Sequence, residues 1–125
     1  MRSSFLVIGC IFAALTVAIG AFGAHALKEI LLENGKTETF KTGVLYQMFH
    51  SIALLVTGLL YPEAQKNSLL NGAGYLFVSG ILLFSGSLYI LSISGITILG
   101  AVTPFGGLCF IAGWMILIYH LLKSN

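Results

Sequence analysis

The sequence has 125 residues, of which 58% are hydrophobic and 8% are charged, with a mean hydropathy of +1.00 and a formal net charge of +2. A water-soluble domain has roughly a quarter of its residues charged, so this composition excludes a soluble globular protein and indicates an integral membrane protein. The small net charge, with no basic patch, also excludes a nucleic-acid-binding protein.

Four apolar segments have the length of about 20 residues that crosses a bilayer as a helix. The first two run over about 5–24 and 44–61, the third over about 69–92, and the fourth ends at Leu122. The sequence therefore predicts an all-α, polytopic membrane protein with four transmembrane helices in one bundle, forming a single domain over residues 1–125.

The first span resembles a secretory signal peptide, because Ala24-His25-Ala26 follows it as a small-x-small cleavage site. Its apolar run is longer than the 7 to 15 residues typical of such signals, so we expect the span to remain attached. The segment from His25 to Gly43 then carries Ala26, Leu27, Ile30 and Leu31 at helical spacing. This pattern predicts a short amphipathic interfacial helix, with a two-turn continuation of the first span as the alternative.

The later boundaries depend on turn residues. Pro62 is expected to end the second span before a short polar turn, and Ser92 and Gly95 to end the third. The fourth span begins either near Ile96, with Pro104 as a kink, or at Pro104, with Thr103 as its N-cap. The sequence does not choose between these starts.

Four spans place both termini on one side of the membrane, here called side A, and the segment after the first span on side B. Lysine and arginine, which set orientation, are equally numerous on the two sides: Arg2, Lys66 and Lys123 against Lys28, Lys36 and Lys41. The orientation therefore stays open.

Small residues recur at steps of three and four along the spans and predict the packing faces, because helices in lipid associate through close backbone approach. The first span has such a face, the fourth has Gly106 and Gly113, and the third has Gly72, Tyr75, Ser79, Gly86 and Tyr89. The face of the first span consists of Gly9, Ala13, Thr16, Gly20 and Gly23. Cys10 and Cys109 lie in apolar surroundings and are interpreted as buried free thiols.

Unusual polar side chains fall near the side B ends of the predicted spans. Because polar groups in hydrocarbon need partners or a watery cavity, we expect them to converge. The candidate ligand-binding residues are His25, Tyr46, Gln47, His50, Ser85, Ser87, Tyr89 and Thr103. One interpretation is a hydrogen-bonded network that joins the helix ends, and the other is a shallow pocket for an amphiphile.

Catalytic chemistry has weaker support. His25 and His50 lack the nearby cysteine or carboxylate ligands of a metal or haem site, and Ser51 points away from His50 on a helix. We therefore predict no catalytic residues, no metal and no cofactor. Trp114 and His120 are interpreted as interfacial anchors towards side A.

Four motifs in chain order resemble an uncharacterised bacterial membrane family, the one numbered 423 among domains of unknown function, which is similar to the animal transmembrane protein 256. The motifs are Gly20-Ala21-Phe22-Gly23-Ala24-His25, Tyr46-Gln47 with His50, Phe84-Ser85-Gly86-Ser87-Leu88-Tyr89, and Thr103-Pro104 with Gly106-Gly107 and Gly113-Trp114. The resemblance covers essentially the whole chain and implies four spans with an uncleaved first helix. It implies no substrate, cofactor or catalytic residue.

The sequence thus predicts a small multi-pass protein of the cell membrane, the inner or plasma membrane of a bacterium, that is not an enzyme. It is expected either to bind a lipid or similar amphiphile in the polar pocket or to serve as a structural or accessory subunit. A small oligomeric channel or transporter is the alternative, and a histidine-dependent metal or haem enzyme is less favoured. The expected partners are membrane lipids, further copies of the chain or another membrane protein.

Overall fold

The structure is a computed structural model that describes residues 2–61 and 66–124, apart from the side chains of Arg2 and Ser3. Pro62 and residues 63–65 of the polar turn expected after it lie outside the described residues, whereas Asn67 of that turn is described and caps α4 by accepting a hydrogen bond from the backbone N–H of Leu70. All regular structure in the described residues is helical. The elements in chain order are α1 (Arg2–Ala24), α2 (Lys28–Glu33), α3 (Thr37–Leu60), α4 (Ser68–Gly80), the π-helical turn η1 (Ile81–Ser85), α5 (Gly86–Ser94), the 3-10 helix η2 (Thr97–Ala101) and α6 (Thr103–Ser124).

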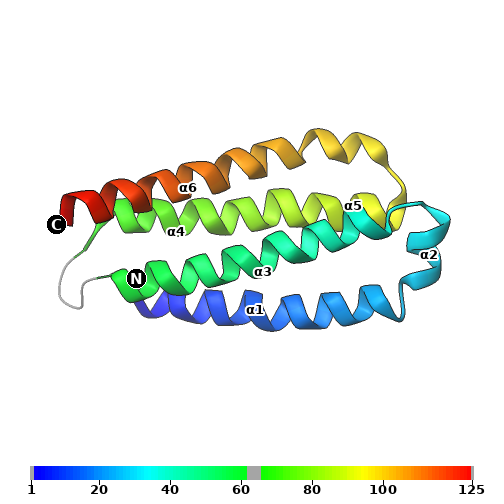
Figure 1. The fold of residues 1–125 in the computed structure, drawn as a ribbon, viewed down its shortest axis with the longest axis horizontal. Helices are drawn as coiled ribbons and strands as arrows, with labels where there is room; N and C mark the ends of the chain where they lie inside the picture. The colour runs from blue at the N-terminus through cyan, green and yellow to red at the C-terminus, as the bar shows by residue number, and fades with distance from the viewer. Residues whose placement is uncertain (1, 62–65, 125) are drawn as a thin grey trace.

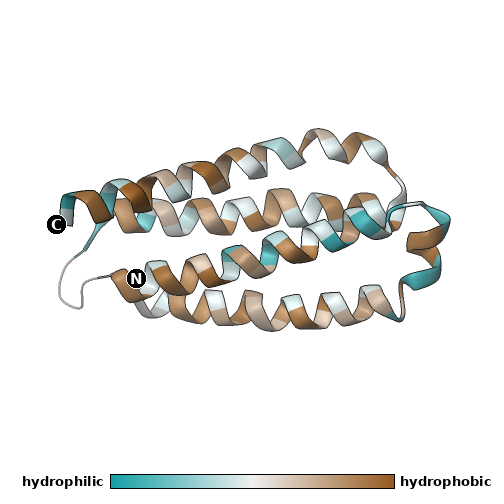
Figure 2. Cartoon of the chain, viewed as in Figure 1, coloured by the Kyte–Doolittle hydropathy of each residue, from teal (hydrophilic) through white to brown (hydrophobic). Residues whose placement is uncertain are grey.

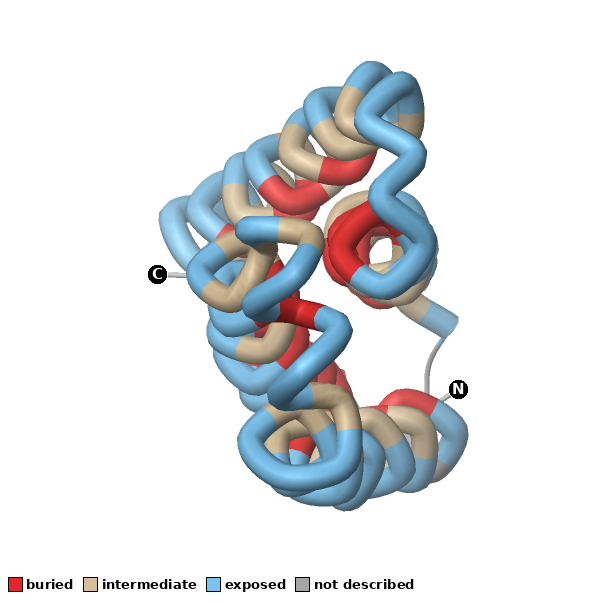
Figure 3. The backbone as a smooth tube through the Cα atoms, turned by 90° about the vertical axis from the view of Figure 1, so that its right-hand side faces the viewer, coloured by how far each residue is buried: buried red, intermediate tan, exposed pale blue. Residues whose placement is uncertain are grey.

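Four stretches are long and apolar enough to cross a membrane, as predicted: Ser4–Ala24, Thr37–Leu60, Ser68–Ser94 and Thr97–Ser124. They run side by side, with α1 packed along α3 and α4 packed along α6 (Figure 1). Hydrophilic residues gather near the ends of these helices and in α2, whereas the long helices are mainly apolar (Figure 2). Buried residues face the space between α3, α4, α5 and α6 (Figure 3).

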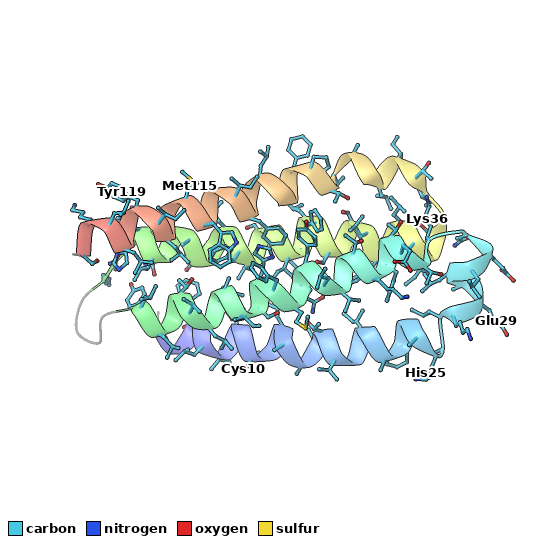
Figure 4. All side chains as sticks on the ribbon, viewed as in Figure 1. Cys10, His25, Glu29, Lys36, Met115 and Tyr119 are labelled. Carbon is cyan, nitrogen blue, oxygen red and sulfur yellow. The ribbon has the colours of Figure 1, made fainter. Side chains whose placement is uncertain are left out.

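The small-residue face of α1 packs against α3, as predicted. A side chain at Gly9 would meet Leu55 and the backbone of Ser51, and one at Gly23 would meet Phe40. The opposite face of α1 is exposed at Val7, Val17 and Phe22, and Cys10 is also exposed (Figure 4). The interpretation of Cys10 as a buried thiol is therefore wrong, because α1 lies at the edge of the molecule.

The predicted packing face of the third span is wrong in part. Tyr75 is 55% exposed, and a side chain added at Gly86 would meet nothing within 4 Å. Gly74 and Gly80 instead lie under phenyl rings from α1 and α6. The span is interrupted by η1, where one additional residue is accommodated in the helix, so a single helical spacing does not hold along its whole length.

The segment between the first two spans differs from the prediction at its C-terminal end. A separate short helix, α2, is present and buries Leu31, so the first span does not simply continue. The next helix, however, begins at Thr37 and not near residue 44. Hydropathy marks only the part of a helix that lipid can surround, and α3 extends two turns further through polar residues.

The fourth span begins with a 3-10 helix near the earlier of the two expected positions, and its α-helix begins at the later one. Gly95 ends α5 in the left-handed conformation, with φ of 74°, and the apolar link that follows contains η2. The α-helix α6 then begins at Thr103. The restricted geometry of Pro104 is accommodated in the first turn of α6, where the missing backbone donor has no cost.

Asn34 holds α2 to the end of α5, a contact that sequence reasoning did not find. Its side-chain amide donates to the carbonyl oxygens of Ser92 and Ile93, both at 3.0 Å, and so satisfies two groups at the C-terminus of the helix.

Asn34→Ala should lower the free energy of unfolding by about 1–2 kcal/mol. Asn34→Asp should be at least as destabilising, because a carboxylate would face carbonyl oxygens. Thermal unfolding in detergent measures both, and a stable aspartate variant would contradict the assignment.

Candidate functional site

His50 and Trp114 lie deeper along their helices than the sequence suggested. His50 lies 13 positions after the start of α3 at Thr37, which is roughly 20 Å along the helix axis. Trp114 lies 11 positions after the start of α6 at Thr103 and is also at mid-helix. The expectation of a cluster close to side B is therefore wrong for His50, because α3 begins earlier than predicted. Trp114 is likewise not at a helix end.

Gln47 joins three helices. Its side chain is 2% exposed, and its amide nitrogen donates to the carbonyl oxygen of Phe12 in α1 at 3.0 Å. The Tyr89 hydroxyl of α5 donates to the amide oxygen of Gln47 at 2.6 Å. The carbonyl of Phe12 also accepts from the hydroxyl of Thr16. These bonds satisfy the polar atoms of Gln47 inside the protein, as the network interpretation expects.

Two hydroxyl contacts join the other helices. Ser85, which is fully buried in η1, donates to the carbonyl oxygen of Gly43 in α3 at 2.7 Å. The hydroxyls of Ser87 and Thr103 lie 2.6 Å apart and connect α5 with α6. Each contact satisfies polar groups within the protein, and none of these three side chains lines the groove described below.

His50 is held between α3 and α6 by two hydrogen bonds. Its Nδ1 lies 2.8 Å from the carbonyl oxygen of Tyr46, and Trp114 Nε1 donates to its Nε2 at 3.1 Å. An indole N–H can only donate and a carbonyl can only accept. The geometry therefore assigns a neutral imidazole with its proton on Nδ1, and neither ring nitrogen is available to a metal.

Aromatic rings surround His50. The ring of Phe110 stacks on the imidazole with centroids 3.5 Å apart and an interplanar angle of 7°. Phe77 and Trp114 contact it at larger angles, and Tyr46 stacks on Phe84 at 4.4 Å. The spacing of four residues between Phe110 and Trp114 is the sequence signal for a shared helix face. Their pairing with His50 depends on how the helices are rotated, which that spacing does not give.

A groove of about 570 Å³ lies between α3 and α6 and is lined mainly by these rings. Tyr46 is 40% exposed and Phe49 is 57% exposed, so the groove opens at the surface that the long apolar helices present to lipid. The complete lining is Leu45, Tyr46, Phe49, His50, Phe84, Gly107, Phe110, Ile111 and Trp114. Of the eight predicted site residues, Tyr46 and His50 line this groove.

His25 lies apart from the other predicted residues. It is exposed at the end of α1 that precedes α2, and its nearest hollow is lined by α1 residues and Ala26 (Figure 4). Among residues 2–61 and 66–124, no group of three or more His, Cys, Asp and Glu side chains is placed to hold a metal ion. Ser51 donates its hydroxyl to the carbonyl of Gln47 at 2.6 Å and so does not pair with His50.

Comparison with known proteins identifies the family of the chain. The family described as "Protein of unknown function (DUF423)" matches residues 19–107, which include the polar residues of α3, η1, α5 and the start of α6. The chain belongs to this family. The resemblance drawn from the four sequence motifs is thus confirmed.

The DUF423 relatives extend over nearly the whole chain. The UPF0382 membrane protein YwdK of Bacillus subtilis is 43% identical to this chain, over an alignment that covers 95% of this chain and 96% of YwdK. The UPF0382 membrane protein of Haemophilus influenzae is 40% identical, covering 100% of this chain and 98% of its own. No solved structure matches the chain. Together with the four apolar spans, these names establish a small membrane protein of the DUF423 family.

Proposed function

We propose that this DUF423 protein binds a membrane-soluble amphiphile in the groove between α3 and α6, as a non-enzymatic protein of the cell membrane. The observation that carries the proposal is the groove itself, about 570 Å³ of space lined by aromatic rings and open to the side. Small-molecule sites are concave, mainly apolar and provided with few polar groups. A ligand could enter this groove directly from the bilayer.

The lining favours a ligand with a planar ring. Tyr46, Phe49 and Trp114 offer ring faces and edges at the groove, and rings of a ligand can stack on such walls. Tyr46 lines the groove and is 40% exposed, so its hydroxyl can donate to a group on a ligand there. This hydroxyl is suited to a carbonyl or similar acceptor on the ring. A quinone with an apolar tail has both features, because its planar ring carries carbonyl groups.

Trp114 is the single tryptophan of the chain and lines the groove, so its fluorescence reports on binding. Titrating a long-chain quinone into the protein in lipid nanodiscs should quench this fluorescence with a saturable curve. Gly107→Leu, which places a side chain in the groove, should weaken binding at least tenfold, and Tyr46→Phe should weaken it several-fold because the hydroxyl is lost.

Tyr119→Phe is the matched control, because Tyr119 lies on the exposed side of α6 away from the groove (Figure 4). It should bind the quinone as the unmodified protein does. Linear quenching that is unchanged by Gly107→Leu would show random collision in the bilayer and overturn the proposal. The polar network would then serve architecture alone, and the search for function would turn to protein partners.

A further inference from the structure

A second groove lies at the α2 end of the molecule and differs in chemistry from the first. It has a volume of about 480 Å³ and is formed by the end of α1, by α2 and by the first half of α3. Its deeper wall is apolar and its rim is polar. The residues that matter here are Gly20, Val44 and Met48 in the wall and Lys28, Thr37 and Lys41 at the rim.

The two lysines approach the groove from different helices. Lys28 belongs to α2 and Lys41 to α3. The Nζ atom of Lys41 lies 3.2 Å from Oε1 of Glu38, but the two side chains are 67% and 87% exposed. An ion pair on the surface contributes little free energy, so it does not hold Lys41 in place. Both ammonium groups can therefore turn to an anion at the rim. Neither Glu38 nor the α2 residues Glu29 and Glu33 line the groove.

Two further features at the rim favour an anion. The hydroxyl oxygen of Thr37 is buried yet has no hydrogen-bond partner among the described residues, which is unusual for a buried polar atom. The long helix α3 also begins at Thr37, and its N-cap residue, Lys36, makes no capping hydrogen bond through its side chain. Unpaired backbone N–H groups and the helix dipole favour negative charge at such an end.

The apolar wall extends from this rim towards mid-membrane. Met48 lies 11 positions after Thr37, roughly 16 Å along the helix axis. The missing side chain of Gly20 leaves room beside Val44, since a Cβ added at Gly20 would have its nearest neighbouring atom 3.5 Å away. A free inorganic anion would use only the rim, whereas a lipid would occupy both parts, its phosphate at the lysines and an acyl chain along the wall.

We propose that this groove is a binding site for one anionic glycerophospholipid, with its phosphate between Lys28, Lys41 and Thr37. Lysine and glutamate are equally numerous at this end of the molecule, so bulk charge does not account for the site. The site depends on the local arrangement of charges instead, because two lysines and no acidic side chain are among the described residues that line the groove. Leu45 lines both this groove and the α3–α6 groove, but Lys28, Thr37 and Lys41 line only this one, so the phosphate site does not depend on a ligand in the α3–α6 groove.

Native mass spectrometry of the protein released from nanodiscs tests the proposal. Nanodiscs that contain phosphatidylglycerol and phosphatidylcholine with identical acyl chains should leave one phosphatidylglycerol per chain, preferred roughly ten- to thirtyfold. The double variant Lys28→Gln/Lys41→Gln should reduce this preference to near unity. Glu38→Gln should change it little, because the exposed ion pair between Glu38 and Lys41 is weak.

The matched control is Lys66→Gln/Lys123→Gln, which removes the same charge from residues at the opposite end of the molecule that do not line the groove. It should keep the preference, and unchanged melting temperatures would show that all variants fold. Equal loss in the control and the groove variant would overturn the proposal in favour of nonspecific charge. Displacement of the lipid by inorganic phosphate or glycerophosphoglycerol alone would also overturn it, since the apolar wall would then contribute nothing.

Discussion

Gly106→Ala is expected to lower the free energy of unfolding by about 2–3 kcal/mol, the upper range for overpacking. A Cβ at Gly106 would collide with the backbone nitrogen and Cα of Phe84 in η1. A flexible side chain can turn away from a new methyl group, but a backbone cannot. The variant therefore has to separate α6 from η1, which loosens the contact along which α6 packs.

The chain offers two controls of the same chemistry. Gly107 is adjacent in sequence, and its Cβ would make only ordinary contacts with the Phe84 ring, whereas Gly86 has open space. Gly107→Ala and Gly86→Ala should be neutral or slightly stabilising, because alanine favours a helix by up to about 1 kcal/mol over glycine. Unfolding in mixed micelles, followed by Trp114 fluorescence, measures all three. Equal stability of the three variants would contradict the close approach of α6 and η1.

Gln47→Leu should lower the free energy of unfolding by about 1–2 kcal/mol. The substitution keeps the volume of the side chain but leaves the Tyr89 hydroxyl without its acceptor. It also removes the bond to the carbonyl of Phe12, which retains the hydroxyl of Thr16. Most of the cost should therefore arise at Tyr89.

A double-mutant cycle isolates that cost. Tyr89→Phe removes the orphaned hydroxyl, so Gln47→Leu should cost less in the Tyr89→Phe background than alone. Coupling energies of polar pairs in membranes average about 0.6 kcal/mol and reach about 1.7 kcal/mol, and this buried bond should lie in the upper part of that range. Tyr75→Phe, on the exposed face of α4, is the control and should show no coupling. Additive losses at Gln47 and Tyr89 would show that the bond contributes nothing to stability.

Apolar length located the four spans because lipid imposes one simple requirement on each of them. The spacing of small residues likewise identified the seam of α1 and the contacts of Gly106 and Gly113, which pack on Phe84 and Phe77. Both features are properties of one helix at a time. They can therefore be predicted without knowledge of neighbouring helices.

The candidate site depended on relations between helices and was predicted less well. Composition did not show that α3 begins at Thr37, so His50 was assigned to a helix end when it lies at mid-helix. The partner of His50, Trp114, is 64 residues away in the chain, and only the relative rotation of α3 and α6 brings them together. The sequence identified the polar residues of the site but not which of them face a groove.

The π-helical turn η1 determines which way the second half of its span faces. An additional residue in a helix offsets everything after it by about 100° around the axis. Ser85, at the end of η1, and Ser87 and Tyr89, which follow it, reach Gly43, Thr103 and Gln47 with this offset in place. Deleting one residue from Ile81–Phe84 would thus act as a rotation more than a shortening. It would turn these hydroxyls away from their partners while leaving the hydropathy of the span almost unchanged.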